Sequence, residues 1–165
     1  MIVIALGSNL SSRAGTPKET LAATLARLSD NEVRLRKVSR FYQTIAWPDP
    51  RDPSFVNAAA IIETDRDPQG LMALLHETEA AFGRVRRARN APRTLDLDLI
   101  DYNGRVEAGP PLLPHPGVEA RGFVLIPLRE IAPGWRHPVS GAAIDELIMA
   151  LPADAREVTP LDAST

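Results

Sequence analysis

The chain has 165 residues, of which 44% are hydrophobic, and this is enough apolar surface for one domain with a real core. It has no cysteine, which excludes disulfides and thiolate chemistry and is typical of a reducing cytoplasm, where we expect the protein to work. The formal net charge of −2 and the pI near 5.9 argue against a general nucleic-acid binder, and no apolar stretch approaches the roughly twenty residues of a membrane span.

The first predicted elements are a strand and a capped helix. An apolar stretch over residues 2–6 predicts a short strand, and the sequence Gly-Ser-Asn that follows is interpreted as a turn. Thr16 and Glu19 form a capping-box pattern with Pro17 at the first helical position, which predicts a helix that runs to about Ser29.

Two strand patterns follow, with a loop between them. Residues 33–42 alternate between polar and apolar side chains, but the phase changes near Lys37 and Val38, which indicates a bulge or bend. Residues 47–53 contain three prolines and are expected to form a loop. Residues 54–64 are apolar on both faces, which predicts a central strand.

A second helix leads into an arginine-rich loop. Asp67 and Pro68 mark the beginning of this helix, and Gly83 marks its end. Its core-facing positions follow a helical period and are Leu71, Leu74, Leu75, Thr78 and Phe82. Positive charge then gathers within ten residues although the total charge is slightly negative, at Arg84, Arg86, Arg87, Arg89 and Arg93.

Two aspartates interrupt what otherwise has the pattern of a buried strand after this loop. Leu95, Leu97 and Leu99 fall on one face by alternation, while Asp96 and Asp98 fall on the other. Further on, an Asn-Gly pair at 103–104 predicts a hairpin, and helices are expected near 124–131 and 143–151.

The order of these elements predicts the fold. The sequence β-α-β-β-α-β is typical of a ferredoxin-like α+β sandwich, with a mainly antiparallel sheet and, in this chain, added C-terminal helices. We expect residues 1–152 to form this single domain, and residues 153–165 to form a poorly ordered tail.

The two aspartates are costly to bury unless a cation neutralises them. Residues two apart on one strand face have Cα atoms roughly 6.6 Å apart, so the carboxylates of Asp96 and Asp98 can lean toward one cation or bridge two. Oxygen ligands without a neighbouring histidine or cysteine favour Mg²⁺ or Mn²⁺ over zinc. A polar strand face paired with surface arginines is the simpler interpretation of a bare D-x-D pattern, but the adjoining arginines favour a combined phosphate and metal site.

The arginine loop and a second loop favour phosphate as the ligand. Arginine binds phosphate oxygens bidentately and its charge is permanent, although most charge runs are simply solvated surface. The stretch "LPHPGVEARGF" adds His115, held between two prolines, and Arg121. Phe123 is either a core residue or a stacking platform, and Asn57 on the predicted central strand is a buried polar group that needs partners.

Together these segments resemble one enzyme family. "RNAPRTLDLDLI", with "GRVR" just upstream, "FVNAA" before it and "PHPGVEARGF" after it, closely resembles 6-hydroxymethyl-7,8-dihydropterin pyrophosphokinase over about residues 3–133. The resemblance implies transfer of pyrophosphate from ATP to the hydroxymethyl group of the pterin, with release of AMP, in folate biosynthesis. It also implies the ferredoxin-like sandwich.

The resemblance further implies a role for each matching residue. Two Mg²⁺ ions, bound with ATP, would be held by Asp96 and Asp98. Catalysis would depend on Arg84, Arg93, Asp96, Asp98, His115 and Arg121. ATP would be bound by His76, Glu79, Arg84, Arg86, Arg93, Leu99, His115 and Arg121. The pterin would be bound by Thr44, Phe55, Asn57, Asp96 and Phe123, with the two aromatic rings on either side of it. One departure is Asn90, which stands where relatives often carry a tryptophan.

Two other interpretations stay open. Another two-metal nucleotidyl or phosphoryl transferase could use the same aspartates without needing the aromatic pair. A non-enzymatic ferredoxin-like RNA-binding module is disfavoured by the acidic pI and by too few strand aromatics for a stacking sheet. The expected partners are ATP and 6-hydroxymethyl-7,8-dihydropterin, with no nucleic acid and no membrane, and the chain is expected to be a monomer.

Overall fold

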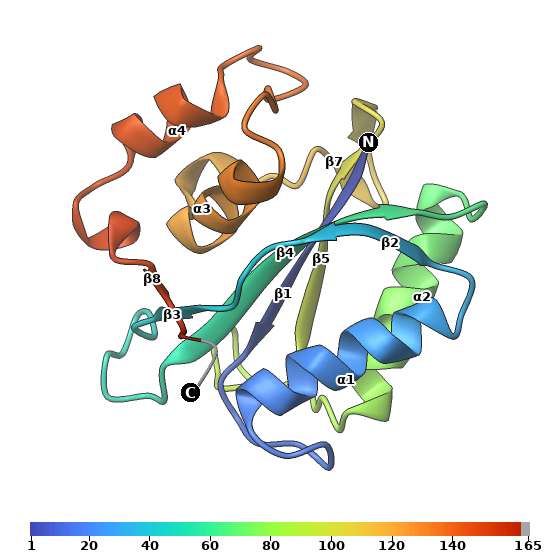
Figure 1. Cartoon of the computed structure of the whole chain (residues 1–165), viewed down its shortest axis with the longest axis vertical. Helices are drawn as coiled ribbons and strands as arrows, with labels where there is room; N and C mark the ends of the chain where they lie inside the picture. The colour runs from blue at the N-terminus through green and yellow to red at the C-terminus, as the bar shows by residue number, and fades with distance from the viewer. Residues whose placement is uncertain (163–165) are drawn as a thin grey trace.

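The fold is built around one six-stranded sheet (Figure 1). The computed structural model describes residues 1–162. In chain order its helices and strands are β1 (Ile2–Ser8), α1 (Pro17–Ser29), β2 (Arg34–Val38), β3 (Tyr42–Thr44), β4 (Phe55–Glu63), α2 (Pro68–Ala81), β5 (Asp96–Tyr102), β6 (Glu107–Ala108), β7 (Leu112–Leu113), α3 (Gly122–Ile131), α4 (Ile144–Ala150) and β8 (Thr159–Pro160). Short 3-10 helices cover Val118–Ala120 and Asp154–Arg156. Among these residues, no helix is long and apolar enough to cross a membrane.

The sheet confirms the α+β class and the central strand. Its order is β5-β1-β4-β3-β8, β2 also pairs with β4, and every pair is antiparallel. The strand predicted over residues 54–64 is β4, which has three strands as partners and is buried over most of its length. The register of β2 against β4 shifts between Leu35 and Lys37, so the predicted bulge is present and lies slightly earlier than predicted.

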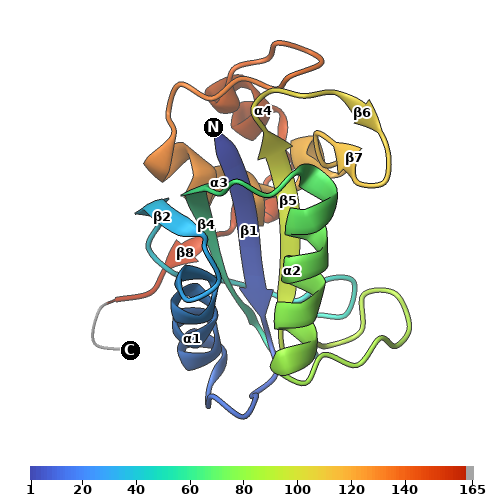
Figure 2. The ribbon, with the colours of Figure 1, turned by 90° about the vertical axis from the view of Figure 1, so that its right-hand side faces the viewer.

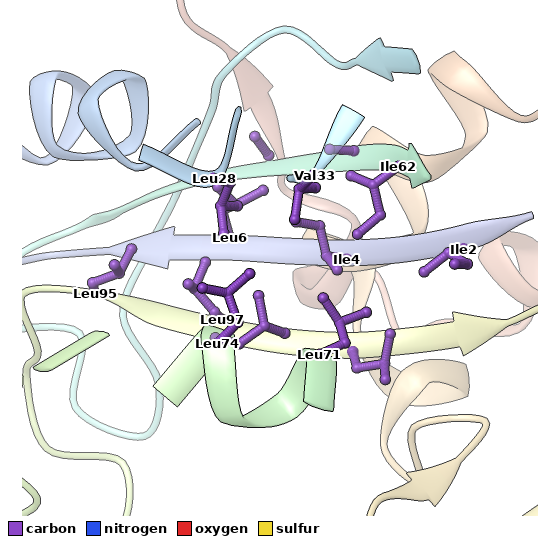
Figure 3. Close-up of a cluster of buried hydrophobic side chains, with 14 of the residues drawn as sticks. Ile2, Ile4, Leu6, Leu28, Val33, Ile62, Leu71, Leu74, Leu95 and Leu97 are labelled. Carbon is purple, nitrogen blue, oxygen red and sulfur yellow. The ribbon is translucent and has the colours of Figure 1, made fainter. Parts of the chain in front are cut away.

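Helices cover both faces of the sheet (Figure 2). On one face, α1 and α2 pack against apolar side chains of β1, β4 and β5, and this core includes Leu95 and Leu97 (Figure 3). Leu99 belongs to the same core. On the other face, α3 and α4 pack against a second core that includes Ile100. Because side chains alternate along a strand, Asp96 and Asp98 of β5 project to the α3 face.

The helix ends follow the sequence signals. The Thr16 hydroxyl accepts a hydrogen bond from the Glu19 N–H at 3.3 Å, and the Glu19 carboxylate accepts one from the Thr16 N–H at 2.7 Å, which confirms the capping box. At the other helix, the Asp67 side chain caps α2. Gly83 has φ +79°, a left-handed conformation that turns the chain out of α2 and into the arginine loop.

The predicted hairpin after β5 is wrong in its pairing. Asn103 and Gly104 form the expected turn with positive φ, at 54° and 73°. The Asn103 N–H and side chain, however, bond to Met1 at the start of β1, so the turn closes against the neighbouring strand of the sheet. The chain then leaves the sheet, and β6 pairs with β7 in a separate two-stranded ribbon.

The segment after Pro152 takes up more structure than the sequence predicts. Asp154–Arg156 form a 3-10 helix, and β8 pairs with β3 at the edge of the sheet. A Cβ atom on Gly122 would lie 1.7 Å from the carbonyl oxygen of Ala155, so the tail packs directly on the beginning of α3. A two-residue strand has no periodicity to detect in a sequence. The last three residues of the expected tail, 163–165, lie outside the described part of the chain.

Candidate active site

Two neighbouring carboxylates on β5 form the centre of the site. Asp96 and Asp98 project from the same face of the strand, and their side chains are 31% and 26% exposed. They therefore stand at the boundary between the second core and solvent, where cationic partners offset the cost of removing a carboxylate from water. The structure supplies those partners from three separate segments.

Asp96 is held by the two ends of the arginine loop. Arg84 Nη1, just after α2, donates to its Oδ1 at 3.0 Å, and Arg93 Nη1, just before β5, donates to its Oδ2 at 3.1 Å. Both guanidinium groups are largely buried. Charge-assisted bonds of this kind are stronger than neutral ones. Arginine therefore neutralises the first carboxylate of the site.

Asp98 is held by the loop that precedes α3. Arg121 Nη1 donates to its Oδ2 at 3.0 Å, and His115 Nε2 lies 3.6 Å from its Oδ1. Burial alone would raise the pKa of Asp98, but His115 and Arg121 together lower it below its usual value. The Nδ1 atom of His115 accepts a hydrogen bond from the Gly117 N–H at 3.1 Å, which leaves Nε2 to face the carboxylate.

A third carboxylate, Glu79 of α2, lies beneath Arg84. Arg84 Nη1 donates to Glu79 Oε2 at 2.6 Å and to the Leu95 carbonyl at 2.7 Å, in addition to its bond with Asp96. Glu79 is only 4% exposed. Burial raises the pKa of Glu79 to about 7, although the Arg84 guanidinium opposes that shift. Arg84 is thus fixed by three acceptors.

The arginine loop covers a cavity of about 300 Å³ above these groups. Its walls consist of the loop itself, Asp96, Asp98 and Arg121, so the structure brings together residues that are far apart in the sequence. Side chains in the middle of the loop are exposed at Arg86, Arg87 and Arg89. Asn90 has φ +62°, a conformation that asparagine adopts more readily than bulky residues do.

Aromatic and amide groups lie beside the carboxylates. Asn57 of β4 is buried, and its Nδ2 donates to Thr44 Oγ1 of β3 at 2.7 Å. A Cβ atom on Gly7 of β1 would lie 3.0 Å from Asn57 Oδ1 and 3.8 Å from the Phe55 ring. A glycine there avoids a close contact with the amide oxygen. The Arg93 guanidinium lies 6.0 Å from the centre of the Phe55 ring.

Phe123 is a surface residue and not a core residue. It is the second residue of α3 and is 38% exposed, and the Arg121 guanidinium lies 5.7 Å from the centre of its ring. An aromatic side chain that is exposed next to a charged cavity is available for stacking with a planar ligand. Of the two interpretations that the sequence leaves open, the core residue is therefore wrong, and the stacking platform stays a prediction.

Two predicted nucleotide residues lie apart from this cluster. His76 is exposed on α2 and is not part of the cavity wall. Leu99 is 3% exposed, and its side chain packs in the core on the opposite face from the carboxylates. Only the backbone of Leu99 could therefore take part in a site on the Asp98 face. Strand alternation already indicated this opposite orientation.

One residue interpreted as part of a turn is a buried structural link. Asn9 is 3% exposed, and its Oδ1 accepts from the Arg93 N–H at 2.8 Å while its Nδ2 donates to the Pro53 carbonyl at 3.0 Å. Its own N–H also donates to the Arg93 carbonyl at 3.1 Å. A polar residue at the end of an otherwise buried strand was the available signal, but its partners are 44 and 84 residues away.

The arrangement defines a class of enzyme. Arginines that converge on paired carboxylates can bind a polyphosphate together with a divalent cation, and the neighbouring aromatic pocket can bind a flat second substrate. This combination is typical of phosphoryl-transfer enzymes, which act mainly through positioning and electrostatics.

Comparison with known proteins identifies the family. Residues 3–133 match the model of the 7,8-dihydro-6-hydroxymethylpterin-pyrophosphokinase family. Relatives of the chain include proteins described as 2-amino-4-hydroxy-6-hydroxymethyldihydropteridine pyrophosphokinase. That of Pseudomonas aeruginosa is 37% identical over 161 residues, which is 96% of each chain, and that of Methylorubrum extorquens is 40% identical over 134 residues, which is 79% of this chain and 81% of the relative. That of Synechocystis sp. is 36% identical over 148 residues, which is 88% of this chain and 73% of the relative. The chain belongs to this family, and it is a pyrophosphokinase of folate biosynthesis that transfers pyrophosphate to hydroxymethyldihydropterin.

Proposed function

We propose that the cluster around Asp96 and Asp98 is where this transfer takes place. The observation that supports the proposal most directly is the pairing of each carboxylate with arginine, since the same arginines can exchange a carboxylate for a phosphate. When ATP enters the cavity, the guanidinium groups of Arg84, Arg93 and Arg121 bind its phosphate oxygens. The carboxylates are then free to bind a metal that accompanies the nucleotide.

The donor set fits magnesium bound mainly by substrate. Among residues 1–162 no group of three or more histidine, cysteine or acidic side chains could hold a metal on its own. Magnesium is usually bound by one or two carboxylates plus substrate phosphates and waters, so Asp96 and Asp98 supply what the protein must contribute. Two such ions would neutralise the phosphate oxygens and polarise the reacting groups.

The pterin is proposed to bind between Phe55 and Phe123. Asn57 and Thr44 lie on the strands beside Phe55, and Asn57 Oδ1 can accept hydrogen bonds from the edge of the ring. Asp96 is near enough to Gly7 to adjoin the same pocket, because a Gly7 Cβ would lie 4.0 Å from the Asp96 Cβ. The pterin thus lies against the carboxylate that Arg93 also contacts.

In the reaction, the hydroxymethyl oxygen of the pterin forms a bond to the β-phosphorus of ATP and gives up its proton to solvent. The bond from that phosphorus to the oxygen of the α-phosphate breaks, and AMP leaves with the bridging oxygen. Arg84 and Arg93 lie at the two ends of the loop and stabilise negative charge on the transferred group. His115 and Arg121 hold phosphate oxygens from the other side. The nucleotide is also expected to contact Arg86, Glu79, His76 and the backbone of Leu99.

We also propose a ferredoxin-like arrangement of one domain, predicted over residues 1–152, to whose sheet β8 adds an edge strand. The strand order β5-β1-β4 followed by β2 and β3, with α1 and α2 on one face, supports this arrangement. Both cores pack on the same sheet, which supports a single folding unit. A monomer in the cytoplasm is the simplest state for the chain, and sedimentation of the purified protein tests the monomer.

The decisive experiment replaces each carboxylate by its amide. Asp96→Asn and Asp98→Asn should abolish the Mg²⁺-dependent formation of AMP and pterin diphosphate, while the proteins stay folded because one of two repelling charges is removed. Asp101→Asn on the same strand is the matched control. Its carboxylate accepts a hydrogen bond from Trp135 Nε1 in the second core, so it should affect stability and leave turnover of folded protein unchanged.

Chromatographic product analysis also separates the other interpretations. A nucleotidyl transferase would leave AMP attached to the acceptor and release pyrophosphate, whereas a binding module would form neither product. Substantial activity in both aspartate variants would overturn the proposed two-metal site, although the family assignment would stand.

A further inference from the structure

Asn9 joins the two loops that border the proposed site. Its amide oxygen accepts a hydrogen bond from the Arg93 N–H at 2.8 Å, and its amide nitrogen donates one to the Pro53 carbonyl at 3.0 Å. The residue is buried at the end of β1, so neither bond can be replaced easily by water. One side chain therefore connects the loop before β4 to the end of the arginine loop.

Both partners of Asn9 lie next to proposed site residues. Pro53 is two residues before Phe55, the proposed stacking ring. Arg93 contacts Asp96 through Nη1 at 3.1 Å and places its guanidinium 6.0 Å from the centre of the Phe55 ring. A shift of the Arg93 backbone would therefore change its contacts with the carboxylate and with the aromatic ring at once.

The segment that follows β1 also contacts the other end of the arginine loop, through Arg13. Arg13, four residues after Asn9, donates from Nε to the Ala81 carbonyl at 2.7 Å and lies 5.1 Å from the centre of the Phe82 ring. Ala81 is the last residue of α2, immediately before the loop begins. The segment that follows β1 thus anchors both ends of the loop, but only Asn9 also reaches the pterin side.

We propose that Asn9 is a positioning residue for the transfer reaction, which acts through Arg93 and through the loop that ends at Pro53. It sets the place of Arg93 relative to Asp96 and Phe55, and it couples the nucleotide side of the site to the pterin side. This proposal rests on the roles proposed above for Arg93 and Phe55. Asn9 itself touches no substrate.

Two substitutions separate the two bonds. Asn9→Ala removes both. Asn9→Asp keeps an oxygen for the Arg93 N–H but replaces the donor to Pro53 by a second oxygen, which repels the carbonyl. Asn31→Ala is the control, because Asn31 also donates to a backbone carbonyl, that of Arg27 at 2.8 Å, at the far end of α1. Single-turnover rates and calorimetric affinities for pterin and for a MgATP analogue are measured on folded protein.

Asn9→Ala should lower the single-turnover rate by about a hundredfold, the effect of misplacing a catalytic group by about 1 Å, while the affinity for the MgATP analogue changes little. Asn9→Asp should recover most of that rate but keep a weakened affinity for pterin. Asn31→Ala should change neither the rate nor the affinity. If Asn9→Ala does not fold, Asn9→Asp alone tests the proposal. The proposal then predicts a near-normal single-turnover rate together with a weakened affinity for pterin.

The proposal is overturned if folded Asn9→Ala resembles Asn31→Ala, with normal rate and normal pterin affinity. It is also overturned if Asn9→Asp binds pterin as tightly as the parent protein. Arg93→Ala distinguishes this failure from a failure of the site itself. A slow Arg93→Ala variant beside a normal Asn9→Ala variant rejects only the role of Asn9, whereas a normal Arg93→Ala variant rejects the assigned site.

Discussion

The buried carboxylate of Glu79 gives the protein a measurable dependence of stability on pH. Its pKa rises from 4.5 to about 7 on folding, because burial disfavours the ionised form. One pKa unit is worth about 1.4 kcal/mol, so the shift corresponds to about 3 kcal/mol. Since the folded pKa is the higher one, this stability is fully present below pH 4.5 and is lost as the pH rises through 7.

Glu79→Gln removes the titrating group and tests this magnitude. Urea unfolding of parent and variant is measured from pH 5 to pH 8.5, and the difference between their free energies of unfolding is plotted against pH. The parent should lose about 2.5 kcal/mol relative to the variant across that range, since part of the total is already lost at pH 5. Arginine stays charged over this range, so the attraction of Arg84 to the ionised Glu79 carboxylate is already included in the pKa of about 7.

Glu77→Gln, an exposed carboxylate on the same helix, controls for the loss of a negative charge. Parallel curves for the parent protein and Glu79→Gln would refute the reasoning, because they would mean that Glu79 binds its proton equally well in the folded and unfolded chains.

Three other changes have clear expected outcomes. Phe123→Ala should weaken pterin binding by roughly 1–3 kcal/mol, the value of one lost stacking contact, and leave ATP binding nearly unchanged; equal losses in calorimetry would contradict the stacking role. Arg84→Ala should lower the single-turnover rate by orders of magnitude with a far smaller loss of MgATP affinity, because it stabilises charge that develops during transfer, and an equal loss of both would contradict this. Gly122→Ala should destabilise the protein, since its methyl group would overlap the Ala155 carbonyl, and an unchanged melting temperature would show that the tail yields without cost.

Local signals predicted most of the scaffold. The capping box at Thr16 and the glycine after α2 define helix ends within a few residues, so they could be found without knowing the fold. The alternation of β5 correctly placed Asp96 and Asp98 on one face and the leucines on the other. By contrast, the partner of Glu107–Ala108 depends on where the chain turns after leaving the sheet, and the predicted hairpin failed for that reason.

The candidate site depends on contacts between distant segments, and these are harder to predict. The motifs indicated which residues take part, but the bond between Arg84 and Glu79, or between Asn9 and both Arg93 and Pro53, arises only when the sheet is assembled. The raised pKa of Glu79 is likewise a property of its burial beneath the loop and has no signature in the sequence. Tertiary packing, and not local propensity, determines these features.

The charge around the cavity beneath the arginine loop also affects how fast each of the two substrates is captured. Six arginines and only two aspartates line it, although the whole chain carries a net charge of −2. ATP, a polyanion, is therefore attracted to the cavity over the last several ångströms although the net charge of the chain is negative, whereas an uncharged pterin diffuses without guidance. Because physiological salt screens charges beyond about 8 Å, rising ionic strength slows the capture of nucleotide and leaves the capture of pterin unchanged. At fixed concentrations of both substrates, a higher salt concentration thus lowers the rate of nucleotide capture relative to that of pterin capture.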